Sequence, residues 1–317
     1  MQASVRCWPV EPGVHILRPR GRPRLVVIAL GASCACWVSI SAARHAPPDI
    51  DALMTRIGER VAGYYRRVQG MICLETATVQ PIGSNLTPEG FARSVESELR
   101  VESDTTDGDE LPGAKVIRAV RRVNGQAPRE RDKTGRSGCT DPNPLSPEPL
   151  AFLLPAHRGE YRFTSVREGK EGGRAALVID FMSANRESRP QLIEDEGGHE
   201  DCFDWSGPLA TRGRVWVDPN TYDVLRADRR LDGPVDLRVD RTLQRRFGFG
   251  PWIVLERDDM TMRYTEVAFS DPNEIIRLPE SIASMTVLRG GLQSVRRTHT
   301  FRDYRRFLVT GRIIKEP

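Results

Sequence analysis

The densest group of reactive side chains in the sequence is the run His199-Glu200-Asp201-Cys202-Phe203-Asp204. Imidazole, thiolate and carboxylate groups are the ligands that zinc takes in proteins. A zinc site also draws ligands from a second segment, and an isolated His-x-x-Cys lacks that second half. A disulfide at Cys202 would in addition consume the thiolate. We therefore expect no metal at this cluster and no other cofactor.

The signatures of common catalytic sites do not occur in the sequence. There is no Gly-x-Ser-x-Gly, phosphate-binding loop or Gly-x-Gly-x-x-Gly element, so nucleophile-elbow and nucleotide-binding sites are not indicated. The pair Asp258-Asp259 could flank a glycosidic bond, but charge pairs on a strand usually belong to its solvated face. His299 alternates with apolar and basic residues on one strand face, where a structural histidine is expected. The sequence predicts a protein that is not an enzyme, with a hydrolase of unrecognised site as an alternative.

The first 43 residues have the pattern of an export signal. Arginines up to Arg24 precede the apolar stretch Leu25–Ile40, and Ser41-Ala42-Ala43 supplies small residues at −3 and −1 of a cut after Ala43. The same stretch could remain as an uncleaved anchor, because about 20 apolar residues span a bilayer. We expect an exported protein of residues 44–317, periplasmic or associated with the cell envelope.

Without the leader, the chain has no excess of positive charge. The whole sequence has 47 basic and 43 acidic side chains, and residues 1–43 contain five arginines and one glutamate. Residues 44–317 therefore carry equal numbers of both signs. A neutral chain gives no support for nucleic-acid binding, so we expect no nucleic-acid partner.

Three of the six cysteines lie outside the leader: Cys73, Cys139 and Cys202. An odd number in an oxidising compartment is typical of one disulfide and one free thiol. Cys73 lies in an apolar run, where a buried cysteine behaves as a small hydrophobic residue. The other two lie in polar, turn-rich segments that would benefit from a covalent clamp. We therefore predict a Cys139–Cys202 disulfide and a free, buried Cys73.

One amphipathic helix is predicted over Asp49–Tyr65, behind Pro47-Pro48. Its apolar residues recur at three- and four-residue spacing: Ile50, Leu53, Met54, Ile57, Val61 and Tyr64. The opposite face is mostly charged. A helix of this kind has one surface to bury, so we expect it to pack against a sheet.

After Gly70 the pattern changes to the period of two that is typical of strands. About ten strands are predicted: Met71–Val79, Phe91–Val101, Val116–Val123, Tyr161–Arg167, Arg174–Met182, Gly213–Asp218, Val224–Leu231, Ile253–Phe269, Ile282–Arg289 and Leu292–Tyr304. The short turns Asn124-Gly125 and Gly290-Gly291 favour antiparallel pairing. The fold class is mainly β (α+β), a curved antiparallel sheet packed with the helix. Residues 44–317 form one domain with long loops at 124–150 and 183–212.

Two tryptophans are candidates for a ligand-binding surface. Trp216 alternates with Val215 and Val217, so both faces of its strand carry an apolar side chain. If one sheet face packs the helix, the other can line a cavity. We therefore predict Trp216 and Trp252 as ligand-binding residues.

Several segments resemble the LolA/LolB-like lipoprotein-carrier fold. The helix end Tyr64-Tyr65-Arg66-Arg67-Val68-Gln69-Gly70 leads into Met71-Ile72-Cys73-Leu74-Glu75. Further similar segments are Gly213-Arg214-Val215-Trp216-Val217-Asp218-Pro219-Asn220-Thr221, Leu278-Pro279-Glu280-Ser281-Ile282 and Phe301-Arg302-Asp303-Tyr304-Arg305-Arg306-Phe307. The resemblance implies a half-barrel whose concave face, closed by helices, holds acyl chains. Tyr222, the long loops and the disulfide depart from that pattern.

Together these observations predict an exported, non-enzymatic protein that shelters a lipid or a lipidated protein in a hydrophobic half-barrel. Burial supplies roughly 0.8 kcal/mol per methylene, which is enough for affinity without a covalent step. The alternative is a structural or protein-interaction module with a partner in the cell envelope. An apolar cavity of several hundred cubic ångströms would favour lipid binding, and a filled sheet interior would favour the interaction module.

Overall fold

The computed structural model describes residues 49–104, 113–133, 149–187, 189–194, 202–270 and 272–306. The expected leader lies outside these ranges, so its cleavage stays a prediction. Cys139 and His199 lie outside them too. None of the described helices combines the length and the apolar character needed to cross a bilayer.

Helix α1 spans Ile50–Val68 and confirms the predicted amphipathic helix. The Asp49 carboxylate caps its first turn by accepting hydrogen bonds from the N–H groups of Asp51 and Ala52, at 3.0 and 3.4 Å. The buried side chains form one stripe along the helix: Leu53, Met54, Ile57, Val61, Tyr65 and Val68. Gly70, with a φ of 74°, then turns the chain into the first strand.

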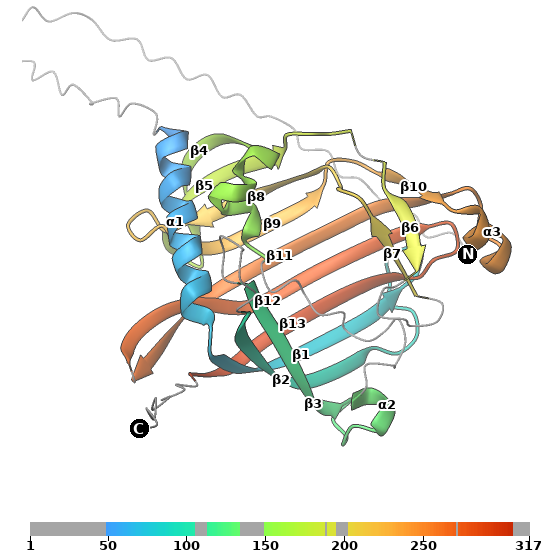
Figure 1. Ribbon diagram of the computed structural model, residues 1–317, viewed down its shortest axis with the longest axis horizontal. Coiled ribbons are helices and arrows are strands. Elements are labelled where there is room, and N and C mark those ends of the chain that lie inside the picture. Colours follow the sequence, from blue (N-terminus) through green and yellow to red (C-terminus); the bar gives the residue numbers. More distant parts are fainter. Residues whose placement is uncertain are drawn as a thin grey trace, which may run out of the picture. The chain divides into compact units, whose positions relative to one another are not determined.

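The strands form one open, mostly antiparallel sheet, which confirms the predicted fold class (Figure 1). Its main path runs β3-β2-β1-β13-β12-β11-β9-β8-β5-β4. The strands on this path are β1 Met71–Ile82, β2 Arg93–Asp104, β3 Gly113–Val123, β4 Tyr161–Glu171, β5 Arg174–Ser183, β8 Thr211–Val217, β9 Val224–Leu231, β11 Trp252–Ser270, β12 Asn273–Arg289 and β13 Ser294–Arg306. The first strand pairs with the last, so the two ends of the described chain meet within the sheet.

Three short strands in the described residues were not predicted: β6 Gln191–Glu194, β7 Phe203–Ser206 and β10 Val235–Val239. The first two lie within the segment 183–212. Four residues are too few for a period of two to stand out from the sequence. β10 pairs with β11 and, in parallel, with β6, so the three form a side branch of the sheet.

Short helices complete the described elements: α2 Glu130–Lys133, η1 Ala151–Leu153, η2 Pro155–Glu160 and α3 Arg241–Phe247. Leu153 and Leu154 are buried and pack with α1 in the main apolar core. The segment of η1 and η2 therefore covers the sheet beside α1.

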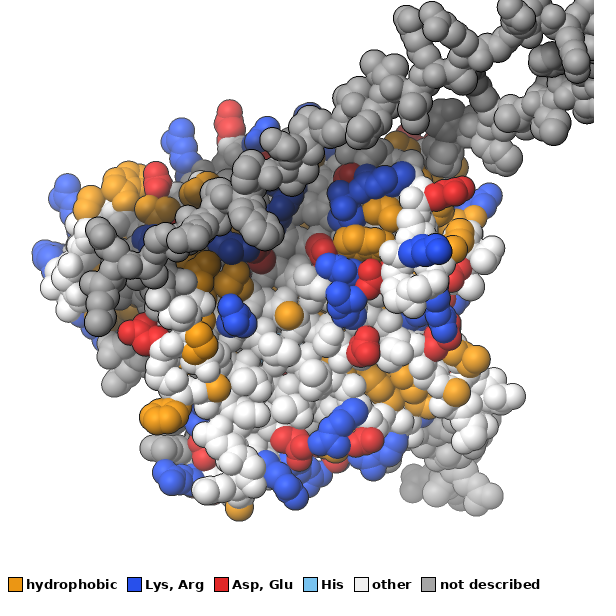
Figure 2. Space-filling model, turned by 180° about the vertical axis from the view of Figure 1, so that it is seen from behind, with side chains coloured by type: hydrophobic (Ala, Val, Ile, Leu, Met, Phe, Trp, Pro, Cys, Tyr) orange, Lys and Arg blue, Asp and Glu red, His pale blue; other side chains and the backbone are white. Residues whose placement is uncertain are grey.

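The register of the sheet defines its two faces. Met262 of β11 lies opposite Ala227 of β9 and Ile282 of β12, and these side chains pack with Ile57 and Val61 of α1. We call this side the inner face. The alternating residues form the outer face. In the view from behind (Figure 2), acidic and basic side chains lie side by side over the surface.

Two of the apolar groups that contact β11 lie on either side of a polar stretch of this strand. Met262 of β11 belongs to the group under α1. Leu255 of the same strand belongs to a second group, which joins the side branch and α3: Leu192, Leu231, Leu237, Val239, Leu243, Ile253 and Leu255. The stretch of β11 between the two groups includes Asp258, a buried carboxyl. The inner face is therefore apolar at two places and polar between them.

Candidate functional site

An apolar cavity of about 80 Å³ lies on the inner face, next to the C-terminal end of α1. Helix α1, five strands and Pro149 line it. The lining residues are Tyr64 and Val68 of α1; Met71 and Cys73 of β1; Leu99 and Val101 of β2; Val116 and Arg118 of β3; Leu278, Pro279 and Ile282 of β12; Phe301 and Tyr304 of β13; and Pro149. Arg118 is the charged residue in this lining. The cavity is the place on the inner face where an apolar group could enter.

None of the described lining residues is an activated nucleophile. Cys73 is a buried free thiol, as predicted. Burial, followed by the nearby Glu75 carboxylate, raises the pKa of Cys73 to about 12, so the thiol stays protonated. Burial also raises the pKa of the Tyr64 hydroxyl, and the Tyr304 hydroxyl donates to the Pro279 carbonyl at 2.7 Å. The lining is suited to burying an apolar group rather than to covalent chemistry.

Arg118 connects the cavity to a buried ion-pair network. Its Nε donates to Glu75 Oε2 at 2.6 Å, and Glu75 Oε1 lies 2.9 Å from His299 Nδ1. Burial acts to raise the pKa of Glu75, but the hydrogen bonds from His299 and Arg118 outweigh it and hold that pKa below its ordinary value. The Glu75 carboxylate is therefore charged at neutral pH although it is buried.

Neither Glu75 nor Arg118 was predicted from the sequence as a site residue. Cys73, Glu75 and Ala77 share one face of β1 by alternation, and all three are buried. A carboxylate at the middle of such a face needs a partner, and this signal was present in the sequence. The identity of the partner was not, because it depends on how β1, β2 and β3 pair.

The cavity is smaller than the several hundred cubic ångströms predicted for a lipid-binding protein. Pockets for drug-sized ligands usually measure about 300–1,000 Å³, whereas this one measures about 80 Å³. Side chains of α1 such as Ile57 and Val61 fill neighbouring space against the sheet. In the described residues, a whole acyl chain would therefore enter only if α1 or its neighbours moved.

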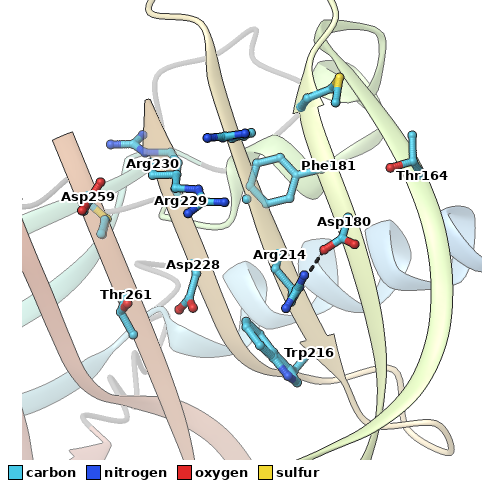
Figure 3. Close-up of a pocket in the computed structure, with 14 residues that line it drawn as sticks. Thr164, Asp180, Phe181, Arg214, Trp216, Asp228, Arg229, Arg230, Asp259 and Thr261 are labelled. Carbon is cyan, nitrogen blue, oxygen red and sulfur yellow. Dashed lines mark hydrogen bonds and ion pairs between the residues drawn. The ribbon is translucent and has the colours of Figure 1, made fainter. Parts of the chain in front are cut away.

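A larger and more polar pocket of about 470 Å³ lies over β5, β8, β9 and β11. Figure 3 shows α1 behind these strands, with Asp180, Arg214 and Trp216 in front. Arg214 Nε donates to Asp180 Oδ1 at 2.6 Å, and Arg167 donates to the other oxygen at 2.7 Å. Burial acts to raise the pKa of Asp180, but these hydrogen bonds lower it to about 2. The acidic and basic groups of this pocket largely pair with one another.

The structure places the two predicted tryptophans apart. Trp216 lies in the polar pocket, with the Arg226 guanidinium carbon 4.6 Å from its ring centroid. Trp252 begins β11, opposite Arg238 of β10, and its residue is 55% exposed. Neither lines the apolar cavity. Their role in ligand binding stays a prediction.

The predicted disulfide also stays a prediction. Cys202 is buried and is not a free thiol, but Cys139 lies outside the described residues. His199, Glu200 and Asp201 lie outside them as well. Within the described ranges, no group of three His, Cys, Asp or Glu residues is placed to hold a metal ion.

No protein-family model matches the sequence, and a search of curated proteins finds no similar sequence. Among solved structures, the chain is similar to an outer-membrane lipoprotein-sorting protein domain from Vibrio parahaemolyticus, with 12% identity, a TM-score of 0.35, and coverage of 81% of this chain and 94% of that one. It is also similar to a LolA superfamily protein from Nitrosomonas europaea, with 10% identity, a TM-score of 0.33 and coverage of 81% and 94%. A third similar structure is the MucA/MucB complex of Pseudomonas aeruginosa, with 11% identity, a TM-score of 0.22 and coverage of 80% and 99%.

Proposed function

We propose that this protein binds the apolar chain of a lipid or a lipidated protein between α1 and the inner face, without a covalent step. The observation that carries the proposal is the apolar cavity, which lies between the C-terminal end of α1 and the five strands from the edge strand β3 to β12. Its lining is apolar apart from Arg118. The expected leader would place this activity in the cell envelope.

The contacts of α1 indicate which part of it could yield to a ligand. Near its N-terminus, Asp51 accepts a hydrogen bond from Arg158 at 2.7 Å. In its middle, Arg60 donates to both oxygens of Asp223 at 2.5 and 2.9 Å. Beside the cavity, the helix is held by apolar packing, by the Leu150 N–H, which donates to the Tyr65 hydroxyl at 3.1 Å, and by Arg306, which donates to the Arg67 carbonyl at 3.0 Å. We propose that a ligand enters by displacing the apolar contacts of this end, while the ion pairs keep the rest of the helix in place.

The energetics suit a reversible carrier. Each methylene that leaves water contributes roughly 0.8 kcal/mol, so a chain of ordinary length can offset the lost packing of a helix end. Cys73 stays protonated, so the cavity offers no covalent attachment. The proposed activity is passive burial, with a lipid or a lipidated protein as the partner.

A titration with the neutral fluorescent probe N-phenyl-1-naphthylamine tests the proposal. The delipidated protein should bind the probe saturably, and unlabelled decanol should displace it. Val101→Trp fills the cavity and should weaken probe binding by at least about tenfold, because overpacking excludes the ligand. Arg100→Trp places the same side chain on the other face of β2 and should leave binding unchanged.

A delipidated protein that binds no probe would contradict the proposal and would favour the interaction module. Equal loss of binding in both variants would show that the probe does not enter this cavity. Circular dichroism of both variants separates these outcomes from a failure to fold.

A further inference from the structure

A band of polar side chains crosses the inner face between its two apolar groups. We call it the polar belt. It comprises Arg229 of β9, Asp258 of β11, Thr286 of β12, Arg297 and His299 of β13, Glu75 of β1 and Arg118 of β3. These residues lie on the inner face, together with Met262 and Ile282. Each lies either an even number of residues along its strand from an inner-face side chain or directly opposite such a side chain on a paired strand. The belt therefore lies on the inner face of the sheet, where the Arg229 side chain is 38% exposed and the Glu75 and His299 side chains are 2% exposed.

Two hydrogen-bonded chains meet on β13 to form the belt. In the first, Arg229 donates to Asp258 at 3.3 Å and Thr286 donates to the same carboxyl at 3.3 Å. Arg297 approaches the Thr286 hydroxyl at 3.5 Å. In the second, the Glu75 carboxylate joins His299 to Arg118.

Three polar atoms of the belt have no hydrogen-bond partner, and two of them are guanidinium N–H donors. The Nε atoms of Arg229 and Arg297 and Nε2 of His299 are buried without a hydrogen bond in the described part of the chain. The whole His299 residue is only 1% exposed. A buried polar atom without a partner costs about 1–3 kcal/mol. Such atoms are rare in folded proteins, so the two guanidinium N–H groups of the belt indicate a missing acceptor.

The belt is continuous with the apolar cavity. Cys73 of the cavity and Glu75 of the belt are two residues apart on β1, and Phe301 and His299 are two apart on β13. Residues two apart on a strand share a face and are separated by about 7 Å. Arg118 belongs to both the cavity lining and the belt. A molecule with its chain in the cavity would hold its polar end against the belt.

We propose that the polar belt binds the anionic head group of an amphiphile whose apolar chain occupies the cavity beneath α1. This inference rests on the proposed function and specifies the class of ligand. Asp258 and Glu75 pair with part of the three guanidinium groups of the belt, but the buried Nε atoms of Arg229 and Arg297 remain without an acceptor. Phosphate or carboxylate oxygens would accept hydrogen bonds from the unpartnered donors, in charge-assisted contacts that are stronger than neutral ones.

The environment of Asp258 disfavours a negative charge on its own side chain, which is consistent with a ligand that supplies the negative charge. Burial raises the pKa of Asp258 above its ordinary value, although the Arg229 charge opposes this. Arg297 has a lowered pKa because it is buried, and the Asp258 and Asp204 carboxylates compensate only part of that cost. An anion beside Arg297 would offset the remaining cost of burying its positive charge.

Competition against the bound neutral probe tests the inference with three compounds: decyl phosphate, decanol and inorganic phosphate. Decyl phosphate should bind at least about tenfold more tightly than decanol, because the two share a chain and differ in the head group. Arg297→Gln should reduce that preference to about threefold or less while decanol binding persists. Arg296→Gln changes the neighbouring, exposed residue on the opposite face and should have no effect. Asp258→Asn should strengthen decyl phosphate binding, because it removes a competing negative charge.

The outcomes separate the two proposals. If neither decanol nor decyl phosphate displaces the probe, the proposed function fails and the inference with it. If both bind equally, the function stands and the head-group inference is overturned. If inorganic phosphate competes as well as decyl phosphate, the belt is a site for free anions and the inference is overturned. If Arg297→Gln fails to fold, the Asp258→Asn variant tests the inference instead, because unfolding cannot raise the affinity for decyl phosphate.

Discussion

His299 Nδ1 lies 2.9 Å from Glu75 Oε1, and both side chains are 2% exposed. The contact joins the first and last strands of the described chain, which pair along their whole length. Arg118 binds the same carboxylate from β3. One buried carboxylate thus connects elements that are 224 residues apart in the sequence.

Glu75→Gln should lower the free energy of unfolding by about 3 kcal/mol at neutral pH, because removing one member of a buried pair leaves the others without compensation. The folded-state pKa of Glu75 is lowered, so its contribution is present above the unfolded pKa and is lost as pH falls through the folded pKa. The difference between the two proteins should therefore be constant near neutral pH and shrink in acid, below the ordinary glutamate value of 4.5. Urea unfolding of both proteins at several pH values measures this difference in the free energy of unfolding.

Glu96→Gln is the matched control for this prediction. Glu96 lies on the neighbouring strand and the opposite face, where Arg302 donates to it at 2.6 Å in an exposed ion pair. Such pairs contribute about 0–1 kcal/mol. A Glu75→Gln variant no less stable than Glu96→Gln would show that the buried carboxylate does not stabilise the fold.

Gly213→Ala should destabilise the protein because β8 has no room for a Cβ at this position. An added Cβ would lie 2.1 Å from the Asp228 carbonyl oxygen and 2.5 Å from the Phe181 ring. The backbone contact cannot be relieved by a change of rotamer, so we expect a loss of about 3 kcal/mol. Gly159→Ala, with open space around it, should change stability by less than about 0.5 kcal/mol. Similar melting temperatures for the two variants would contradict this account of β8.

The fold could be predicted from the sequence where the pattern was long. The stripe from Leu53 to Val61 predicted α1, and its end moved only from Tyr65 to Val68. Alternation over many residues likewise predicted the main strands. The short strand Gln191–Glu194 was missed because its pairing with β10 is a tertiary contact, which no local period encodes.

The candidate site could be predicted much less well. Trp216 was predicted because both faces of its strand carry apolar side chains, but the apolar cavity is lined by other residues, such as Cys73, Leu99 and Phe301. Those residues come from several strands, and their meeting depends on the register of the sheet. The alternation of β1 places Glu75 on the same face as Cys73, so its position could be predicted from the sequence. Its contact with Arg118 follows only from the pairing of three strands.

Differential alkylation tests the predicted thiols. Cys73 should be alkylated in the denatured, unreduced protein, whereas Cys139 and Cys202 should react only after reduction. Both alkylated peptides of the predicted pair should then appear together as reductant is added. A disulfide requires the two Cα atoms to lie within about 7 Å. Alkylation of Cys139 before reduction would exclude the pairing.

Replacing Trp216 distinguishes the two pockets as ligand sites. Its ring lies beside Arg226 and Arg214 in the polar pocket, away from the cavity beneath α1. Trp216→Asp removes cation–π contacts that are each worth about 0.5–1 kcal/mol at exposed sites, so the protein should remain folded. If the ligand chain occupies the cavity, affinity for N-phenyl-1-naphthylamine should stay within about twofold of the unmodified protein, whereas Leu99→Asp, which places a charge in the cavity lining, should abolish binding. A large loss of affinity in Trp216→Asp would instead establish the polar pocket as the ligand site, as the sequence predicted for this residue.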